Sequence, residues 1–160
     1  MKVLLVGNPN AGKSTLFNAL SGGHAKVGNW HGVTVSALEK ETTLGGRRVT
    51  LVDLPGIYAA QGMSMEEKGA RDYLAAHPVS PVLFVCECGA LARCLPLLFA
   101  LAEGRRTILV LTKARRFYAK GGVLNAALLG RRLGIPVVSA AGVGGSALRR
   151  EAARVLTAPV

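Results

Sequence analysis

Acidic residues are almost absent from the last third of the chain. Residues 1–104 contain 9 Lys and Arg against 8 Asp and Glu, whereas residues 105–160 contain 11 Lys and Arg against the single Glu151. A surface of one sign is either simply solvated or attractive to anions, of which lipid head groups and nucleic acid are the two extended classes. The charge alone does not choose between these readings.

Cysteine and long apolar runs are also scarce. The three cysteines lie within residues 86–94, and their odd number and close spacing exclude a secreted disulfide framework and predict a reducing, intracellular compartment. The longest apolar stretch, residues 78–102, contains Glu87 and Arg93, whereas a membrane span needs about 20 mostly uncharged residues. No cleavage-site pattern follows the first apolar run. We therefore expect a soluble chain.

Apolar β-rich runs alternate with amphipathic runs along the whole sequence. This alternation predicts one α/β domain over residues 1–160, with helices on both faces of a mostly parallel sheet and no helical or transmembrane domain. The turn at residues 44–47 predicts a hairpin at one edge, which pairs a strand near Ser36–Thr42 antiparallel with the strand that ends at Asp53. Six strands are expected in all. Besides the strand near Ser36–Thr42 and its hairpin partner Val49–Val52, they are Lys2–Val6, Val82–Cys86, Thr107–Leu111 and Ile135–Val138.

Five segments predict helices. Ser146 is a suitable N-cap for the last of them, and Pro96 interrupts the third, so that this helix should begin later or be kinked. The expected helices are Lys13–Leu20, Glu66–Ala76, Leu91–Glu103, Val123–Leu133 and Ser146–Leu156.

A phosphate-loop motif joins the first predicted strand to the first predicted helix. Residues 7–14 read Gly-Asn-Pro-Asn-Ala-Gly-Lys-Ser and match G-x-x-x-x-G-K-[ST]. The glycines let backbone N–H groups surround a β-phosphate, Lys13 reaches the β- and γ-oxygens, and the Ser14 hydroxyl coordinates Mg²⁺. The motif and its strand–helix context predict a nucleoside triphosphate site.

Two further segments fit a nucleotide switch. Residues 51–56 place D-x-x-G at the end of an apolar strand; Asp53 would hold Mg²⁺ through water, and the Gly56 N–H would contact the γ-phosphate. Residues 27–35 form a Gly-rich segment in which Thr34 could close over Mg²⁺ and the γ-phosphate.

Four sequence blocks resemble the cytoplasmic GTPase domain of FeoB-type bacterial ferrous iron transporters. They are residues 7–14, 27–35, 53–58 and 66–74. The likeness is close over about residues 1–75 and looser, through Val137–Ala140, to the C-terminus. It implies a Ras-like P-loop GTPase fold, GTP and GDP as ligands, Mg²⁺ as cofactor and slow hydrolysis of GTP.

The resemblance also implies a setting. It places the domain at the cytoplasmic face of the bacterial inner membrane, as the switch of a protein that imports Fe²⁺, with the transmembrane part of that protein as its partner. The chain alone would be soluble and cytoplasmic, an anionic membrane surface is a further possible partner, and a second copy of the chain could cover apolar surface.

Members of this family are similar to potassium-activated GTPases, so the resemblance implies K⁺ at Asn10 and at the carbonyls of Gly28 and Trp30, where a cation would neutralise developing charge. Catalysis is assigned to Asn10, Lys13, Thr34 and Gly56, and Mg²⁺ to Ser14, Thr34 and Asp53. The nucleotide-binding residues are Gly7, Asn8, Pro9, Asn10, Ala11, Gly12, Lys13, Ser14, Thr15, Gly32, Val33, Thr34, Asp53, Gly56, Thr112, Lys113, Ser139 and Ala140.

The sequence departs from the GTPase pattern at two places. Ile57 stands where many small GTPases place a water-orienting glutamine, which predicts slow turnover. Thr112 and Arg115 replace the asparagine and aspartate of N-[KM]-x-D, so the carboxylate that selects guanine is missing and we expect weakened affinity or relaxed specificity. The Ala140 N–H would still meet the guanine carbonyl oxygen.

Three other interpretations stay open. The basic C-terminal part is compatible with an RNA- or ribosome-associated GTPase, although it lacks an RNA-binding sequence motif, which makes nucleic acid the weaker partner. The departures at Thr112 and Arg115 are compatible with a degenerate module that binds nucleotide without hydrolysing it. Cys86, Cys88 and Cys94 could bind metal, but no fourth ligand has suitable spacing, so we interpret them as small buried side chains.

Overall fold

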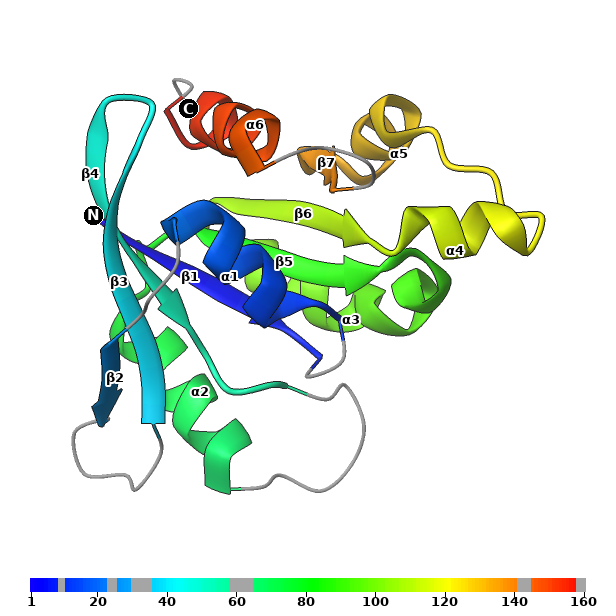
Figure 1. Ribbon diagram of the computed structural model, residues 1–160. Helices are drawn as coiled ribbons and strands as arrows, with labels where there is room; N and C mark the ends of the chain where they lie inside the picture. The colour runs from blue at the N-terminus through cyan, green and yellow to red at the C-terminus, as the bar shows by residue number, and fades with distance from the viewer. Residues whose placement is uncertain (9–10, 23–25, 30–35, 58–64, 141–144, 158–160) are drawn as a thin grey trace.

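The fold is a single twisted sheet with helices on both faces (Figure 1). The computed structural model describes residues 1–8, 11–22, 26–29, 36–57, 65–140 and 145–157. Its seven strands run in the order β2-β3-β4-β1-β5-β6-β7. The strands are β1 Lys2–Gly7, β2 Lys26–Asn29, β3 Ser36–Leu44, β4 Arg47–Asp53, β5 Val82–Glu87, β6 Thr107–Thr112 and β7 Val137–Ser139.

The predicted α/β class and the antiparallel hairpin are confirmed, with one strand more than the six expected. β1 pairs parallel with β4 and β5, and β6 with β5 and β7, whereas β3 pairs antiparallel with β4. The additional strand β2 pairs antiparallel with β3 at the edge of the sheet. At four residues, two of them Gly28 and Asn29, β2 has little of the apolar alternation that marks a strand.

The helices agree with the prediction to within one residue at each end, except at three points. α5 begins three residues later than expected, because the Asn125 side chain caps it by accepting from the Leu128 N–H at 3.0 Å. α3 begins at Leu91 and contains Pro96, so the later start is wrong. The short helix α4 was not expected. The predicted N-cap of the last helix is also wrong, since that helix begins at Gly145 and Ser146 lies within it. The helices are α1 Lys13–Ser21, α2 Met65–Ala76, α3 Leu91–Ala102 after a 3-10 turn at Cys88–Ala90, α4 Ala114–Ala119, α5 Ala126–Leu133 and α6 Gly145–Thr157.

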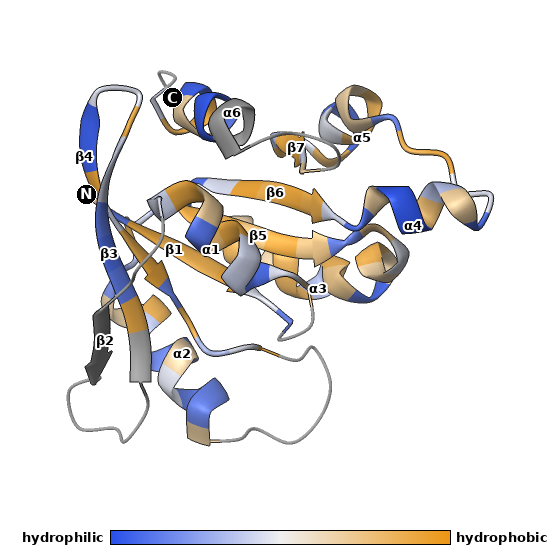
Figure 2. Ribbon diagram, viewed as in Figure 1, coloured by the Kyte–Doolittle hydropathy of each residue, from blue (hydrophilic) through white to orange (hydrophobic). Residues whose placement is uncertain are grey.

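Two apolar cores lie on the two faces of the sheet, as the hydropathy colouring of the inner strands indicates (Figure 2). Side chains alternate along β1, so that Leu4 belongs to the core under α2 and α3, whereas Leu5 belongs to the core under α1 and α6. Phe17 of α1 is fully buried in the second core, and such burial stabilises the fold by about 1.5–3 kcal/mol per large side chain. This packing fixes α1 against β1, β3 and β4.

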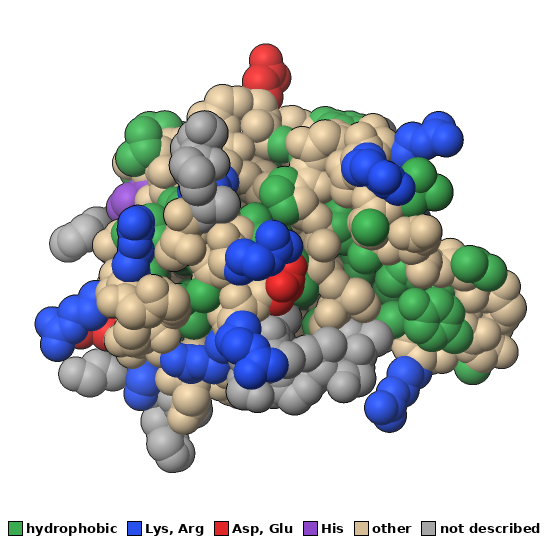
Figure 3. All heavy atoms as spheres, turned by 90° about the horizontal axis from the view of Figure 1, so that it is seen from above, with side chains coloured by type: hydrophobic (Ala, Val, Ile, Leu, Met, Phe, Trp, Pro, Cys, Tyr) green, Lys and Arg blue, Asp and Glu red, His purple; other side chains and the backbone are tan. Residues whose placement is uncertain are grey.

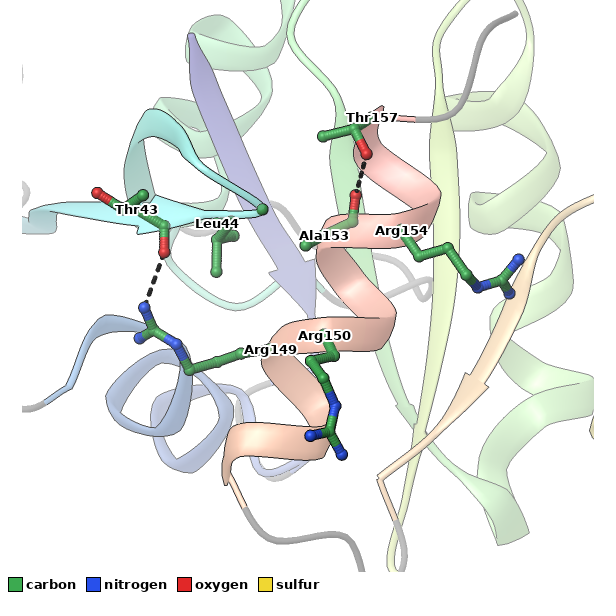
Figure 4. A pocket seen from close by; sticks show the side chains of 8 residues that line it. Thr43, Leu44, Arg149, Arg150, Ala153, Arg154 and Thr157 are labelled. Atoms are coloured by element: carbon green, nitrogen blue, oxygen red, sulfur yellow. Dashed lines mark hydrogen bonds between the residues drawn. The ribbon is translucent and has the colours of Figure 1, made fainter.

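Three arginines of the basic C-terminal part bind the ends of helices. Arg105 donates to a carbonyl oxygen in the last turn of α2 at 2.8 Å, and Arg106 donates to one in the last turn of α6 at 2.9 Å. Arg149 donates to a carbonyl oxygen in the last turn of α1 and, at 2.8 Å, to the Thr43 carbonyl oxygen of the hairpin (Figure 4). Cations satisfy the free carbonyls and the negative dipole at helix C-termini. A part of the positive excess is therefore structural.

In the described residues, no helix combines the length and the apolar character that crossing a bilayer demands.

Candidate nucleotide-binding site

The phosphate loop begins at a position where only glycine fits. Gly7 ends β1, and a Cβ atom there would lie 2.2 Å from the Val85 carbonyl oxygen of β5. The loop then turns back, since the Ala11 N–H donates to the Asn8 carbonyl oxygen at 3.1 Å, and Gly12 adopts a positive φ of 84°. Pro9 and Asn10 lie outside the described residues. The chain thus closes a tight turn directly before α1.

The N-terminus of α1 is open towards this loop. Its N-cap is Gly12, no side chain of the described residues caps the helix, and no acidic residue lies in its first turn. The first N–H groups of an uncapped helix and its dipole favour an anion. Ser14 and Thr15 are exposed at the same end, so their hydroxyl groups are accessible to a ligand held by the loop.

Lys13 and Asp53, 40 residues apart in the chain, form a buried ion pair. Only 6% of Lys13 and 7% of Asp53 is exposed, and Lys13 also donates to the Leu54 carbonyl oxygen at 2.6 Å. β1 and β4 are parallel neighbours in which Leu5 lies opposite Asp53, so their carboxyl ends meet at one edge of the sheet. The predicted phosphate-binding lysine and magnesium-binding carboxylate are therefore brought together.

Backbone hydrogen bonds hold the D-x-x-G turn against the phosphate loop. The Leu54 N–H donates to the Leu5 carbonyl oxygen at 3.2 Å, and the Ile57 N–H donates to the Gly7 carbonyl oxygen at 3.1 Å. Gly56 lies between these two anchors. Ile57 itself is fully buried in the core under α2 and α3, so its side chain cannot orient a water molecule in the site.

Thr112 connects the end of β6 to the phosphate loop. Its hydroxyl group donates to the Ala11 carbonyl oxygen at 2.6 Å and lies 3.4 Å from the Cys86 carbonyl oxygen. The buried side chain therefore points into the loop, not towards a base. Sequence reasoning missed this contact, because a 101-residue separation gives no local signal.

Lys113 is the residue after Thr112 and has a positive φ of 56°. Its side chain forms an ion pair of 3.2 Å with Glu87 at the end of β5. Glu87 was not predicted as part of this region, although a charged residue at the carboxyl end of a buried strand is a usable signal. Arg115 is exposed in α4. The edge that would face a base therefore carries Lys113 and Glu87 in place of the missing aspartate.

One predicted hydrogen bond is not available in this arrangement. The Ala140 N–H, which was expected to meet a guanine carbonyl oxygen, donates to the Leu111 carbonyl oxygen at 2.8 Å. Ser139 ends β7 opposite Leu111, so the second base-side segment does lie beside the first. The short strand uses the amide of its following residue to extend the sheet.

The donor atoms fit Mg²⁺ by their chemistry. A serine hydroxyl and a carboxylate are hard oxygen ligands of the kind that this ion takes, and Ser14 and Asp53 lie at the start of α1 and the end of β4. The third magnesium ligand, Thr34, lies outside the described residues, as do Trp30, Gly32 and Val33. Gly28 lies in β2 opposite Ala37.

The three cysteines are buried close to the edge of the sheet at which the phosphate loop lies. The Asn8 side-chain amide lies 3.9 Å from the Cys94 Sγ, and burial together with the Cys94 thiol raises the pKa of Cys86. Burial also raises the pKa of Cys88. Within the described part of the chain, no cluster of three His, Cys, Asp or Glu residues could hold a metal ion. The Cys86 and Cys88 thiols therefore stay protonated, and all three cysteine side chains pack in the core under α2 and α3.

Comparison with known protein families identifies the family of this chain. The sequence profile of ferrous iron transport protein B matches residues 1–153. The chain belongs to this family. Among its FeoB relatives, the Fe(2+) transporter FeoB of Methanocaldococcus jannaschii is 43% identical over 102 residues, which are 64% of this chain and 15% of the relative. The Fe(2+) transport protein A/FeoB fusion protein of Porphyromonas gingivalis is 38% identical over 150 residues, 92% of this chain and 18% of the relative.

Solved FeoB structures share the fold. The G domain of T. maritima FeoB superposes with a TM-score of 0.81 at 36% identity, over 98% of this chain and 99% of that one. A GDP-bound mutant of the S. thermophilus FeoB G domain gives 0.83 at 34% identity, over 100% of this chain and 64% of that one. The predicted FeoB G-domain fold is thus confirmed. This chain spans less than a fifth of the two FeoB relatives described above.

Proposed function

We propose that this FeoB-family domain binds GTP and GDP at the phosphate loop and hydrolyses GTP slowly, as the cytoplasmic nucleotide switch of a ferrous iron transporter. The observation that supports this most is the convergence of Lys13, Asp53 and the D-x-x-G turn on one loop. The GDP-bound relatives and the family membership support the choice of ligand. The transmembrane part of the transporter is the partner that would receive the signal.

Binding would proceed by an exchange of charges around Lys13. The loop N–H groups between Gly7 and Ser14 would donate to the diphosphate oxygens, and the Lys13 ammonium would move from Asp53 to phosphate oxygens. The Asp53 carboxylate would then be able to hold hydrated Mg²⁺ with Ser14 and Thr34. Bound Mg²⁺ supplies electrostatic stabilisation of the phosphate oxygens. Gly56 would donate its N–H to the γ-phosphate and so couple the D-x-x-G turn to hydrolysis.

Slow turnover follows from the burial of Ile57, whose side chain cannot orient the attacking water as a glutamine at this position would. We propose that K⁺, held by Asn10 and by the carbonyls of Gly28 and Trp30, supplies part of the missing charge stabilisation. Phosphate release in K⁺ should exceed that in Na⁺, and Asn10→Ala should abolish the difference. Equal rates in both salts for the parent chain would refute the potassium site.

Relaxed nucleotide specificity follows from Thr112, Arg115 and Ala140. The Thr112 side chain points into the phosphate loop. Arg115 is a cation in place of a carboxylate acceptor, and the Ala140 N–H already donates to the Leu111 carbonyl oxygen. Calorimetric affinities for GDP and ADP should therefore agree to within roughly tenfold, because a polar site that lacks its hydrogen-bonding groups loses most of its discrimination. A preference for GDP of several orders of magnitude would contradict relaxed specificity.

The nucleotide site itself is tested by two substitutions. Lys13→Ala and Ser14→Ala should each weaken GDP binding in magnesium buffer by roughly 10–100-fold, since charge-assisted hydrogen bonds contribute about 1.5–3 kcal/mol. Ser14 is exposed, so the second variant keeps its fold even if the first leaves Asp53 buried without a partner. Lys120→Ala, on exposed surface at the end of α4, is the matched control. Unchanged affinity in both site variants would exclude the proposal.

A second candidate function is a nucleotide sensor that does not turn over. The buried Ile57 favours it. Retained GTP binding without multiple-turnover phosphate release in either K⁺ or Na⁺ would identify it.

A further inference from the structure

The segment from Lys113 to Gly134, here called the α4–α5 projection, carries charge of one sign only. It contains six Lys and Arg and no Asp or Glu. In Figure 1 it extends beyond the sheet at the end remote from the β3–β4 hairpin. The carboxylate that faces it is Glu87 of β5, which pairs with Lys113 and lines a cavity of about 250 Å³ beside α4.

The remaining five cations of the projection differ from the arginines that bind helix ends. They are exposed, and among the ion pairs of the described residues none includes them. These cations are Arg115, Arg116, Lys120, Arg131 and Arg132. Their charge is therefore directed to the solvent.

Apolar side chains are exposed among these cations. Val123 is 89% exposed, Tyr118 47% and Leu128 41%, and no residue of α5 is fully buried. Figure 3 shows hydrophobic side chains at this edge with Lys and Arg side chains beside them. Figure 2 shows an apolar stretch between α4 and α5. Apolar side chains exposed beside cations are the combination that surfaces binding the membrane interface present.

The turn that follows α4 is held in shape by contacts within the projection. After α4, the Gly121 N–H donates to the Tyr118 carbonyl oxygen at 3.0 Å and the Gly122 N–H donates to the Phe117 carbonyl oxygen at 2.9 Å. A Cβ atom at Gly122 would lie 2.5 Å from the Phe117 ring, and this ring packs against the core under α2 and α3. The turn therefore presents Val123 outwards from a fixed base.

We propose that the α4–α5 projection docks this domain on a bilayer of anionic lipid. The cations would bind head-group phosphates, while Val123, Tyr118 and Leu128 enter the interfacial region, where aromatic and aliphatic tips gain apolar surroundings. Nucleic acid would use the charges but gives no apolar environment to an aliphatic tip, so the observations favour lipid. The proposal does not depend on nucleotide binding.

Flotation of the 160-residue chain with vesicles tests the surface. Vesicles of phosphatidylcholine with about a third phosphatidylglycerol should bind the chain, and pure phosphatidylcholine vesicles should not. Arg115→Gln/Arg116→Gln/Lys120→Gln should lower the partition constant on the order of 100-fold, since each cation near an anionic surface contributes a several-fold factor. The matched control removes three exposed cations elsewhere, Arg47→Gln/Arg48→Gln/Arg93→Gln, and should retain most of the binding.

Val123→Asn separates lipid from nucleic acid. The change keeps every cation and should weaken vesicle binding several-fold without altering retention on single-stranded RNA. Circular dichroism verifies that each variant is folded. The proposal is overturned if the two triple variants lose binding equally, if Val123→Asn binds vesicles like the parent, or if the chain binds RNA and ignores anionic vesicles.

Discussion

At the scale of single residues, the Thr112 hydroxyl determines how the phosphate loop is held. It donates to the Ala11 carbonyl oxygen from the end of β6, so it contributes to the position of the loop rather than to recognition of a base. A residue at this position can thus affect all nucleotides alike.

Thr112→Val should weaken GDP and ADP binding together, roughly tenfold, because the isosteric change leaves the buried Ala11 carbonyl oxygen without its donor. Thr112→Ser keeps the hydroxyl and should restore most of the affinity. Calorimetric titration of both nucleotides measures the effect. A loss confined to GDP would show that Thr112 reads the base after all.

Gly7→Ala should lower the free energy of unfolding by about 1–3 kcal/mol or more, because the new methyl group meets backbone of the neighbouring strand, which cannot move aside. Gly89→Ala is the control, since a Cβ atom there has nothing within 4 Å. Urea denaturation of the two variants gives the comparison. Equal stability would mean that β1 and β5 separate more easily than their register suggests.

At the scale of elements, α5 depends on its N-cap. None of its residues is fully buried, and isolated short helices are marginal in water. Asn125→Ala should therefore cost about 0.5–2 kcal/mol and speed hydrogen exchange of the Leu128 and Leu129 amides. Asn125→Asp retains a capping oxygen and should exchange like the parent. Faster exchange in both variants would argue against the cap.

The elements also show how far sequence reasoning extends. Lys13 and Asp53 were predictable as partners, because each belongs to a motif at the end of an apolar strand and parallel strands end at one edge. α4 was not, since only Ala114 of its six residues is buried and apolar periodicity is the main sequence signal. The hydrogen bond from the Ala140 N–H to the Leu111 carbonyl oxygen was not predictable either, because a motif specifies residue types but not whether a backbone donor is already used.

At the scale of the whole molecule, the buried thiols make stability depend on alkaline pH. The pKa of Cys86 is raised in the folded state, so the unfolded chain loses the thiol proton first, and stability present below about pH 9 declines as the pH rises further. Between pH 9 and 10 the parent should lose up to about 1.4 kcal/mol per unit for this thiol. Cys86→Ala should flatten the slope, although its cavity lowers stability at every pH. An unchanged slope would assign the dependence to other groups.

The bridge made by Arg149 also bears on how the protein is made. This side chain joins α1 to the hairpin across 129 and 106 residues of sequence, and such distant closures form late. While a ribosome is still adding residues before position 149, the first half of the nascent polypeptide lacks the hydrogen bonds that Arg149 donates. Maturation of the domain is therefore expected to finish only after translation has passed that codon.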